Sequence, residues 1–190
     1  MSIRYVSTFV TVGSTAALAL VLHLIGGITI TPIIPYLSTL YPGSGFYIAF
    51  GLWFGLWGAI GVYIGTMIGG IIFGWPLFIV VVFMLVNFIT ALLPKIVHKA
   101  IKYDLDLKDK KGWAAHIGFN AIVLSAITAT WGTWMFVYFM KWITEAYWWP
   151  FWAGWFLGNV VVGIIIGSAL LKLLSRFIVK TPLYVKSFIS

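Results

Sequence analysis

Long apolar runs restrict the possible folds of this chain more than any other feature of its sequence. About 20 apolar residues in a helix span the hydrocarbon core of a membrane. Runs near or above this length are Tyr5–Gly26, Pro76–Val97, Trp113–Met140 and Trp149–Leu171. Only 8% of the residues are charged, whereas a soluble domain carries about a quarter. The sequence therefore predicts one integral membrane domain over residues 1–190, located in the cell membrane and in contact with lipid.

The basic residues gather in three clusters at the ends of the apolar runs. The first is Arg4, the second is six lysines within Lys95–Lys111, and the third is four basic residues within Lys172–Lys186. Lysine and arginine favour the cytoplasmic side of a membrane. We therefore expect all three clusters, and both termini, to be cytoplasmic, with an even number of spans between neighbouring clusters. This distribution explains the net charge of +8 without a nucleic-acid partner.

A glycine-rich run, FGLWFGLWGAIGVYIGTMIGG, covers Phe50–Gly70. If this run crossed the membrane once, three spans would separate Arg4 from the six lysines, and the lysines would lie outside. An even number of spans therefore favours two short helices, Gly43–Leu56 and Gly58–Phe73, with a turn near GLWG. At ~1.5 Å per residue the first is only ~20 Å long. The alternative is one long helix together with a re-entrant segment elsewhere. The predicted fold is thus an all-α, polytopic membrane helix bundle of about six transmembrane helices with short second and third spans.

The stretch GGITITPIIPYLSTLYPGSG, residues 26–45, separates the first two spans. Its prolines and β-branched residues disfavour a helix. We expect an ordered outer loop or a re-entrant segment packed on the bundle.

An aromatic segment, KWITEAYWWPFWAGW, covers Lys141–Trp155. Aromatic faces around one carboxylate suit a flat or cationic ligand. The alternative is an aromatic belt, because tryptophan and tyrosine favour the headgroup region of a membrane. The candidate ligand contacts in this segment are Trp142, Glu145, Tyr147, Trp148, Trp149, Trp152 and Trp155.

Three asparagines lie within the apolar runs, and an amide in hydrocarbon needs a partner. Asn87 and Asn159 are expected about halfway through the membrane, where they could form the floor of an outward cavity. Asn120 is expected nearer the cytoplasm, in a hydrogen bond between helices. Three threonines in the outer half of the fifth span, Thr128, Thr130 and Thr133, could add hydroxyl groups.

Several kinds of chemistry find no support in the sequence. There is no cysteine, and the histidines divide between the two membrane faces, with His23 outside and His98 and His116 inside. The sequence shows no general base placed next to a nucleophile, and none of its glycines belongs to a phosphate-binding G-K-S/T motif. We therefore predict no catalytic site, no metal site and no cofactor. If the protein moves a solute uphill, another chain must hydrolyse ATP.

Six short expected spans in about 190 residues, expected cytoplasmic termini and three local motifs resemble the substrate-binding S-components of energy-coupling factor (ECF) vitamin transporters. The motifs are YPGSGFYIAFGLWFGLWGAIGVYIG, the Asn87–Lys99 segment N-F-x-x-x-L-x-P-x-x-x-x-K, and WFLGNVVVGIIIGSALLKLL. The resemblance implies a receptor that binds a small vitamin-like solute, aromatic or heterocyclic, from outside. It also implies a coupling membrane subunit with ATPases as partners. In the first span, Gly13 and Ala17 stand where members carry two alanines. The implied partner interface is Gly13, Ala17, Gly61 and Gly65.

A second resemblance is to membrane sensor domains, which also have glycine-spaced spans and a W-x-L-G entry to a late span. Such domains are longer and usually feed a cytoplasmic signalling domain, which we do not expect within residues 1–190. The alternative function is therefore a non-transporting structural or sensory subunit of a larger complex, anchored by its aromatic belt.

Overall fold

The computed structural model describes residues 3–28, 38 and 40–188, and in these ranges the long elements are all helical. Five stretches are long and apolar enough to cross a membrane. They are Tyr5–Gly27, Gly43–Ile72, Leu77–Ile101, Lys110–Phe139 and Glu145–Ile178. The prediction of an all-α polytopic bundle is thereby confirmed. Most of the loop predicted over residues 26–45 lies outside the described residues.

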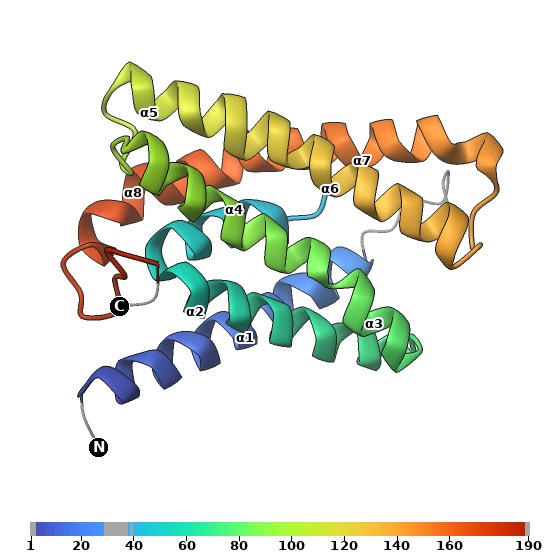
Figure 1. The fold of residues 1–190 in the computed structure, drawn as a ribbon, viewed down its shortest axis with the longest axis horizontal. Helices are drawn as coiled ribbons and strands as arrows, with labels where there is room; N and C mark the ends of the chain where they lie inside the picture. The colour runs from blue at the N-terminus through green and yellow to red at the C-terminus, as the bar shows by residue number, and fades with distance from the viewer. Residues whose placement is uncertain (1–2, 29–37, 39, 189–190) are drawn as a thin grey trace.

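The five stretches contain eight α-helices and shorter π- or 3₁₀-helical segments (Figure 1). The α-helices are α1 (Ile3–Ile28), α2 (Gly43–Ile72), α3 (Leu77–Phe83), α4 (Leu85–Ile101), α5 (Lys110–Ala115), α6 (Leu124–Trp134), α7 (Trp148–Val162) and α8 (Ser168–Ile178). The shorter segments are η1 (His116–Val123), η2 (Met135–Phe139), η3 (Glu145–Tyr147) and η4 (Gly163–Gly167).

Helix α2 reverses its direction at Gly55. The backbone there has φ 58° and ψ −137°, a conformation that only glycine adopts without strain. Both halves of α2 then contact the same residue of α1. Tyr47 Oη donates to the Ala19 carbonyl at 3.2 Å, and a Cβ atom placed on Gly65 would lie 3.0 Å from Ala19 Cβ. In an unbroken helix residues 47 and 65 would be about 27 Å apart. The halves therefore run back along each other (Figure 1), with the break inside the predicted turn.

The second half of α2 packs closely on α1 through its glycines. A Cβ atom on Gly61 would collide with the Thr15 hydroxyl, and one on Gly65 with the Ala16 carbonyl. The prediction that Gly61 and Gly65 form a partner interface is therefore wrong in this structure. Small residues let two helix backbones approach in lipid, and here that approach is internal.

The C-terminal segment 181–188 returns to the Gly55 turn. Val185 N donates to the Trp53 carbonyl at 2.9 Å, and Leu56 N donates to the Phe188 carbonyl at 3.2 Å. These bonds use backbone groups that the broken helix leaves without partners. The segment therefore stabilises the turn by capping both halves of α2.

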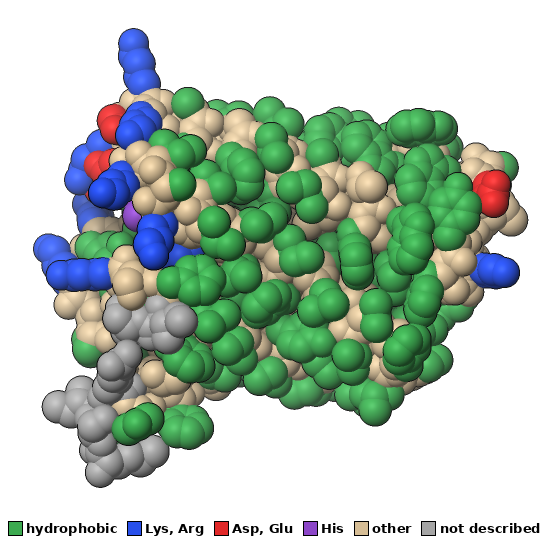
Figure 2. Space-filling view, in the orientation of Figure 1, with side chains coloured by type: hydrophobic (Ala, Val, Ile, Leu, Met, Phe, Trp, Pro, Cys, Tyr) green, Lys and Arg blue, Asp and Glu red, His purple; other side chains and the backbone are tan. Residues whose placement is uncertain are grey.

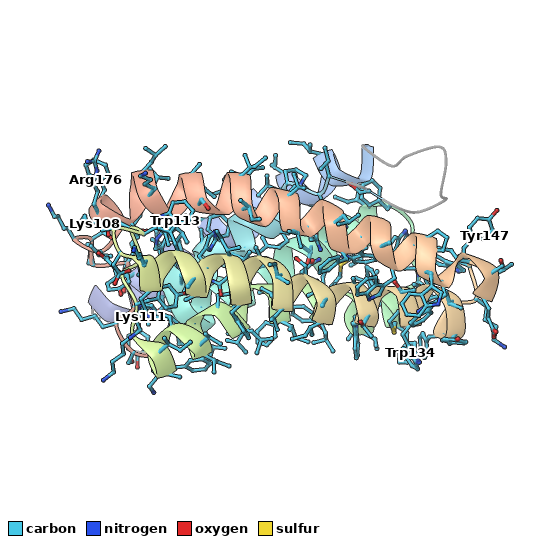
Figure 3. All side chains as sticks on the ribbon, turned by 90° about the horizontal axis from the view of Figure 1, so that it is seen from above. Lys108, Lys111, Trp113, Trp134, Tyr147 and Arg176 are labelled. Atoms are coloured by element: carbon cyan, nitrogen blue, oxygen red, sulfur yellow. The ribbon has the colours of Figure 1, made fainter. Side chains whose placement is uncertain are left out.

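The charged residues mark one end of the bundle, here called the basic end. Figure 2 shows most Lys and Arg side chains there, with a largely apolar surface between the two ends. Lys108, Lys111 and Arg176 point outward at the basic end, and Tyr147 lies at the opposite, aromatic end (Figure 3). Lys108 Nζ pairs with Asp106 at 2.5 Å, and this hydrogen bond lowers the pKa of the Asp106 carboxyl. The described start of α1 and the C-terminal segment also lie at the basic end (Figure 1).

Two π-helical segments, η1 and η4, contact each other within the bundle. His116 Nε2 donates to the Gly163 carbonyl at 3.1 Å. One turn further along, Asn120 Nδ2 donates to Tyr103 Oη at 3.0 Å. Asn120 thus makes a packing hydrogen bond, as the sequence predicts, although its partner is in the loop between α4 and α5.

Candidate functional site

A cavity of about 310 Å³ lies within the bundle, towards the aromatic end. The reversal of α2 helps to form it, because Ser44 at the start of α2 and Phe73 just after its end both line the cavity. Helices α1, α3, α4, α6 and α7, segment η2 and residues before α2 and α3 supply the rest of the lining. The lining residues are His23, Gly26, Gly27, Ser38, Tyr41, Ser44, Phe73, Trp75, Phe83, Val86, Asn87, Thr90, Thr128, Phe136, Trp155 and Asn159.

Aromatic rings form one wall of the cavity in edge-to-face contact. The ring centroids of Trp75 and Phe83 are 5.3 Å apart, and those of Phe83 and Phe136 are 5.2 Å apart. Trp155 joins this cluster 6.0 Å from Phe83, and its indole lies over Gly132 of α6, where a Cβ atom would collide with the ring. Such edge-to-face pairs stabilise one another, so the wall is preformed.

Two asparagines contribute amide groups to this otherwise largely apolar cavity. Asn87 and Asn159 are each only 9% exposed. Asn87 Nδ2 has one weak partner, the Met84 sulfur at 3.5 Å. The Asn159 amide makes no hydrogen bond to any residue in the described part of the chain. Buried polar groups are normally paired, so these amides are available to a ligand.

Two threonines also line the cavity, but their protons are already used. Thr90 Oγ1 donates to the Val86 carbonyl at 2.8 Å, and Thr128 Oγ1 donates to the Ser125 carbonyl at 3.2 Å. Their hydroxyl oxygens can therefore only accept hydrogen bonds from a ligand.

A chain of hydrogen bonds determines which ring nitrogen of His23 carries the proton. Tyr47 Oη donates to the Ala19 carbonyl, so it must accept from Tyr41 Oη, which is 2.7 Å away. Tyr41 has then used its proton and must accept from His23 Nδ1, at 2.9 Å. In the neutral ring, Nε2 is therefore the acceptor, and it is buried without a partner among the described residues. Burial also raises the pKa of Tyr41, which keeps its hydroxyl protonated.

The structure divides the residues predicted for the site into two groups. Trp155, Asn159 and Asn87 come together around the cavity. Trp142 lies behind its aromatic wall, with its ring centroid 5.3 Å from that of Trp75. Trp148 packs on Tyr138 instead, with ring centroids 5.4 Å apart.

The remaining predicted residues lie outside the cavity. Trp152 Nε1 donates to the hydroxyl of Thr130 at 3.0 Å. Glu145, Tyr147 and Trp149 are exposed at the aromatic end, and 71% of Trp149 is accessible. Glu145 and Tyr147 lie in η3 and Trp149 in the first turn of α7, and none of the three lines the cavity, so they do not close it in this structure.

Several lining residues have no place in the sequence prediction of the site. The hydrogen bond between His23 and Tyr41 joins the last turns of α1 to the segment just before α2, and Trp75 lies in the turn before α3. The turn itself is indicated by the sequence, because Gly74 and Pro76 flank Trp75. In the structure Gly74 has φ 77°, and Pro76 immediately precedes α3. Nothing in the spacing of these residues indicated that they would meet.

Comparisons with known protein families, with characterised proteins and with solved structures find no match for this chain. The resemblance to S-components therefore stays a prediction from the motifs.

Proposed function

We propose that the protein is a membrane receptor that binds a small solute in the cavity, as the substrate-binding subunit of an ECF-type importer. The observation that supports this most directly is the cavity itself. Its volume of about 310 Å³ is at the lower end of the range typical of small-molecule sites, and its apolar walls with a few polar groups have the usual composition of such sites.

The proposed topology has six crossings, with both halves of α2 counted as separate short spans. The basic end faces the cytoplasm, because Lys and Arg favour that side, and both termini are then cytoplasmic. The cavity lies towards the outer face, where a receptor for uptake would receive its solute.

The proposed partner is a coupling membrane subunit with ATPases. Because Gly61 and Gly65 are used inside the bundle, the remaining candidate for docking is the exposed face of α1 with Gly13 and Ala17. A Cβ atom on Gly13 would meet nothing within 4 Å, so a helix of another subunit could approach closely there.

Binding can be tested by mass spectrometry of small molecules released from the purified protein. Two threonines of α6, two residues apart, allow a test variant and a matched control variant with the same substitution. Thr128 lines the cavity, and Thr130 is exposed on the outer surface of the helix. Thr128→Ile should reduce the amount of bound solute, and Thr130→Ile should not.

The outcome against this proposal would be the absence of any released solute, together with no change of tryptophan fluorescence on addition of vitamins and heterocycles. The alternative, a structural or sensory subunit, would then be preferred. The exposed positions of Tyr147 and Trp149 at one end of the bundle favour a belt function for these rings under either proposal.

A further inference from the structure

The cavity has no charged wall. None of its lining residues in the described part of the chain is Lys, Arg, Asp or Glu. The nearest charged residues in the sequence at this end, Lys141 and Glu145, are exposed. A carboxylate or ammonium group that entered the cavity would lose its hydration without gaining a counter-ion, which strongly opposes binding.

The two cavity amides differ in what they still offer. Neither Nδ2 nor Oδ1 of Asn159 makes a hydrogen bond to a described residue. Asn87 directs its Nδ2 to the Met84 sulfur, so its Oδ1 is the atom that can accept a hydrogen bond from a ligand. The oxygens of Thr90 and Thr128 add acceptors only, because both hydroxyl protons are bound to helix carbonyls. With His23 Nε2, which is buried without a partner among the described residues, these oxygens give the cavity several unused acceptors beside the Asn159 donor.

The aromatic wall restricts the shape of the ligand. Trp75, Phe83, Phe136 and Trp155 are packed edge to face, so ring faces and ring edges are both presented to the cavity. A flat ring can form offset or edge-to-face contacts with such a wall. A bulky saturated body could not use these contacts.

We propose that the ligand is an uncharged planar ring compound with a carboxamide-like edge, whose N–H donates to Asn87 or a threonine oxygen and whose carbonyl accepts from Asn159 Nδ2. This inference rests on the proposed solute-binding function of the cavity. Binding of the wrong probe and binding of no probe are different outcomes, so failure of the ligand class is distinguishable from failure of the cavity as a solute site.

The experiment uses the full-length protein in lipid nanodiscs and follows four probes by fluorine NMR, with empty nanodiscs subtracted. The probes are para-fluorobenzamide, para-fluorobenzoate, para-fluorobenzylammonium and para-fluorotoluene. They share one ring and differ in the group that would meet the asparagines. We expect the benzamide to bind most tightly, the toluene about tenfold more weakly, and the two ions at least about a hundredfold more weakly.

Two variants of Asn159 connect the preference to this residue. Asn159→Leu should weaken benzamide binding about tenfold and leave toluene binding in place. Asn159→Asp keeps the shape of the side chain and adds a negative charge, so it should raise the affinity for the benzylammonium ion. The expected result for Asn159→Asp is a gain of benzylammonium affinity, and a variant that failed to fold could not show such a gain.

Each outcome decides the proposal. Equal binding of benzamide and toluene, or a benzamide affinity unchanged by Asn159→Leu, would overturn the carboxamide class while leaving an aromatic-binding cavity. Benzoate or benzylammonium as the best probe of the unmodified protein would also overturn it. Failure of all four probes to bind would overturn both the ligand class and the cavity as a solute site.

Discussion

The Lys95 ammonium donates a hydrogen bond to the Leu52 carbonyl oxygen at 2.9 Å, within the bundle. Lys95 is only 1% exposed, and its Nζ also donates to the Val185 carbonyl at 2.5 Å. Leu52 belongs to the last turn before the break at Gly55, where carbonyls without helical partners carry partial negative charge. The Tyr184 ring, 5.0 Å from Nζ, gives a further contact. One buried cation thus connects α4, the end of a half-helix and the C-terminal segment.

The first prediction concerns this cation. Lys95→Met should lower the free energy of unfolding by about 1.5–3 kcal/mol, because two buried carbonyls lose a charge-assisted hydrogen bond. The measurement is thermal unfolding in detergent, with limited proteolysis of the C-terminal segment as a second readout. Lys99→Met, one turn further along α4 at an exposed position, is the control. Equal melting of both variants would show that Lys95 does not hold the turn.

The second prediction concerns the reversal of α2. Gly55→Ala should destabilise the protein by about 1–3 kcal/mol, because a side chain is strained at φ 58° and ψ −137°. Gly118→Ala is the matched control, since Gly118 is helical and a Cβ atom there meets nothing within 4 Å. The control should be neutral or slightly stabilising. Unfolding midpoints of the two variants that coincide would argue for a continuous α2.

Much of the fold was predictable because charge and apolar length obey simple rules in a membrane. The even number of crossings required by the basic clusters indicated a turn within the glycine run, and Gly55 occupies that turn. Hydrophobic periodicity alone could not find it, since apolar residues continue on both sides of the break. The signal came from lysines far away in the sequence.

The site was less predictable, because it depends on side-chain directions between helices. Composition pointed to the aromatic segment 141–155, yet only Trp155 of that segment lines the cavity. His23, Phe73 and Phe136 come from three other elements, and their convergence follows from helix packing that no local spacing encodes. The glycine faces were misassigned for the same reason: small residues predict a close helix contact but not which helix makes it.

The third prediction concerns topology. The chain has no cysteine, so a single introduced cysteine can be labelled without background. In sealed right-side-out vesicles an impermeant thiol reagent should label Glu145→Cys and should not label Lys108→Cys. Both side chains are exposed, so accessibility differs only through the membrane. Rapid labelling of Lys108→Cys with intact vesicles would contradict the proposed orientation.

The fourth prediction separates internal packing from partner docking. Gly65→Leu should strongly reduce thermal stability, because its side chain would collide with the Ala16 carbonyl. Gly13→Leu should melt as the unmodified protein does, because the space around Gly13 is open. If α1 docks on a coupling subunit, Gly13→Leu should still reduce co-purification of that subunit. Normal co-purification would move the docking surface away from Gly13 and Ala17.

The last prediction compares two tryptophans of one helix. Trp155 lines the cavity, whereas Trp149 is 71% exposed at the aromatic end. Trp155→Ala should weaken para-fluorobenzamide binding about ten- to hundredfold, on the scale known for aromatic stacking with bases. Trp149→Ala should leave that affinity unchanged, because an exposed ring at the membrane interface contributes anchoring alone. Fluorine NMR titration in nanodiscs measures both. Equal losses would mean that the segment from Trp142 to Trp155 closes over the ligand as a lid, and an unchanged affinity in Trp155→Ala would place the ligand elsewhere.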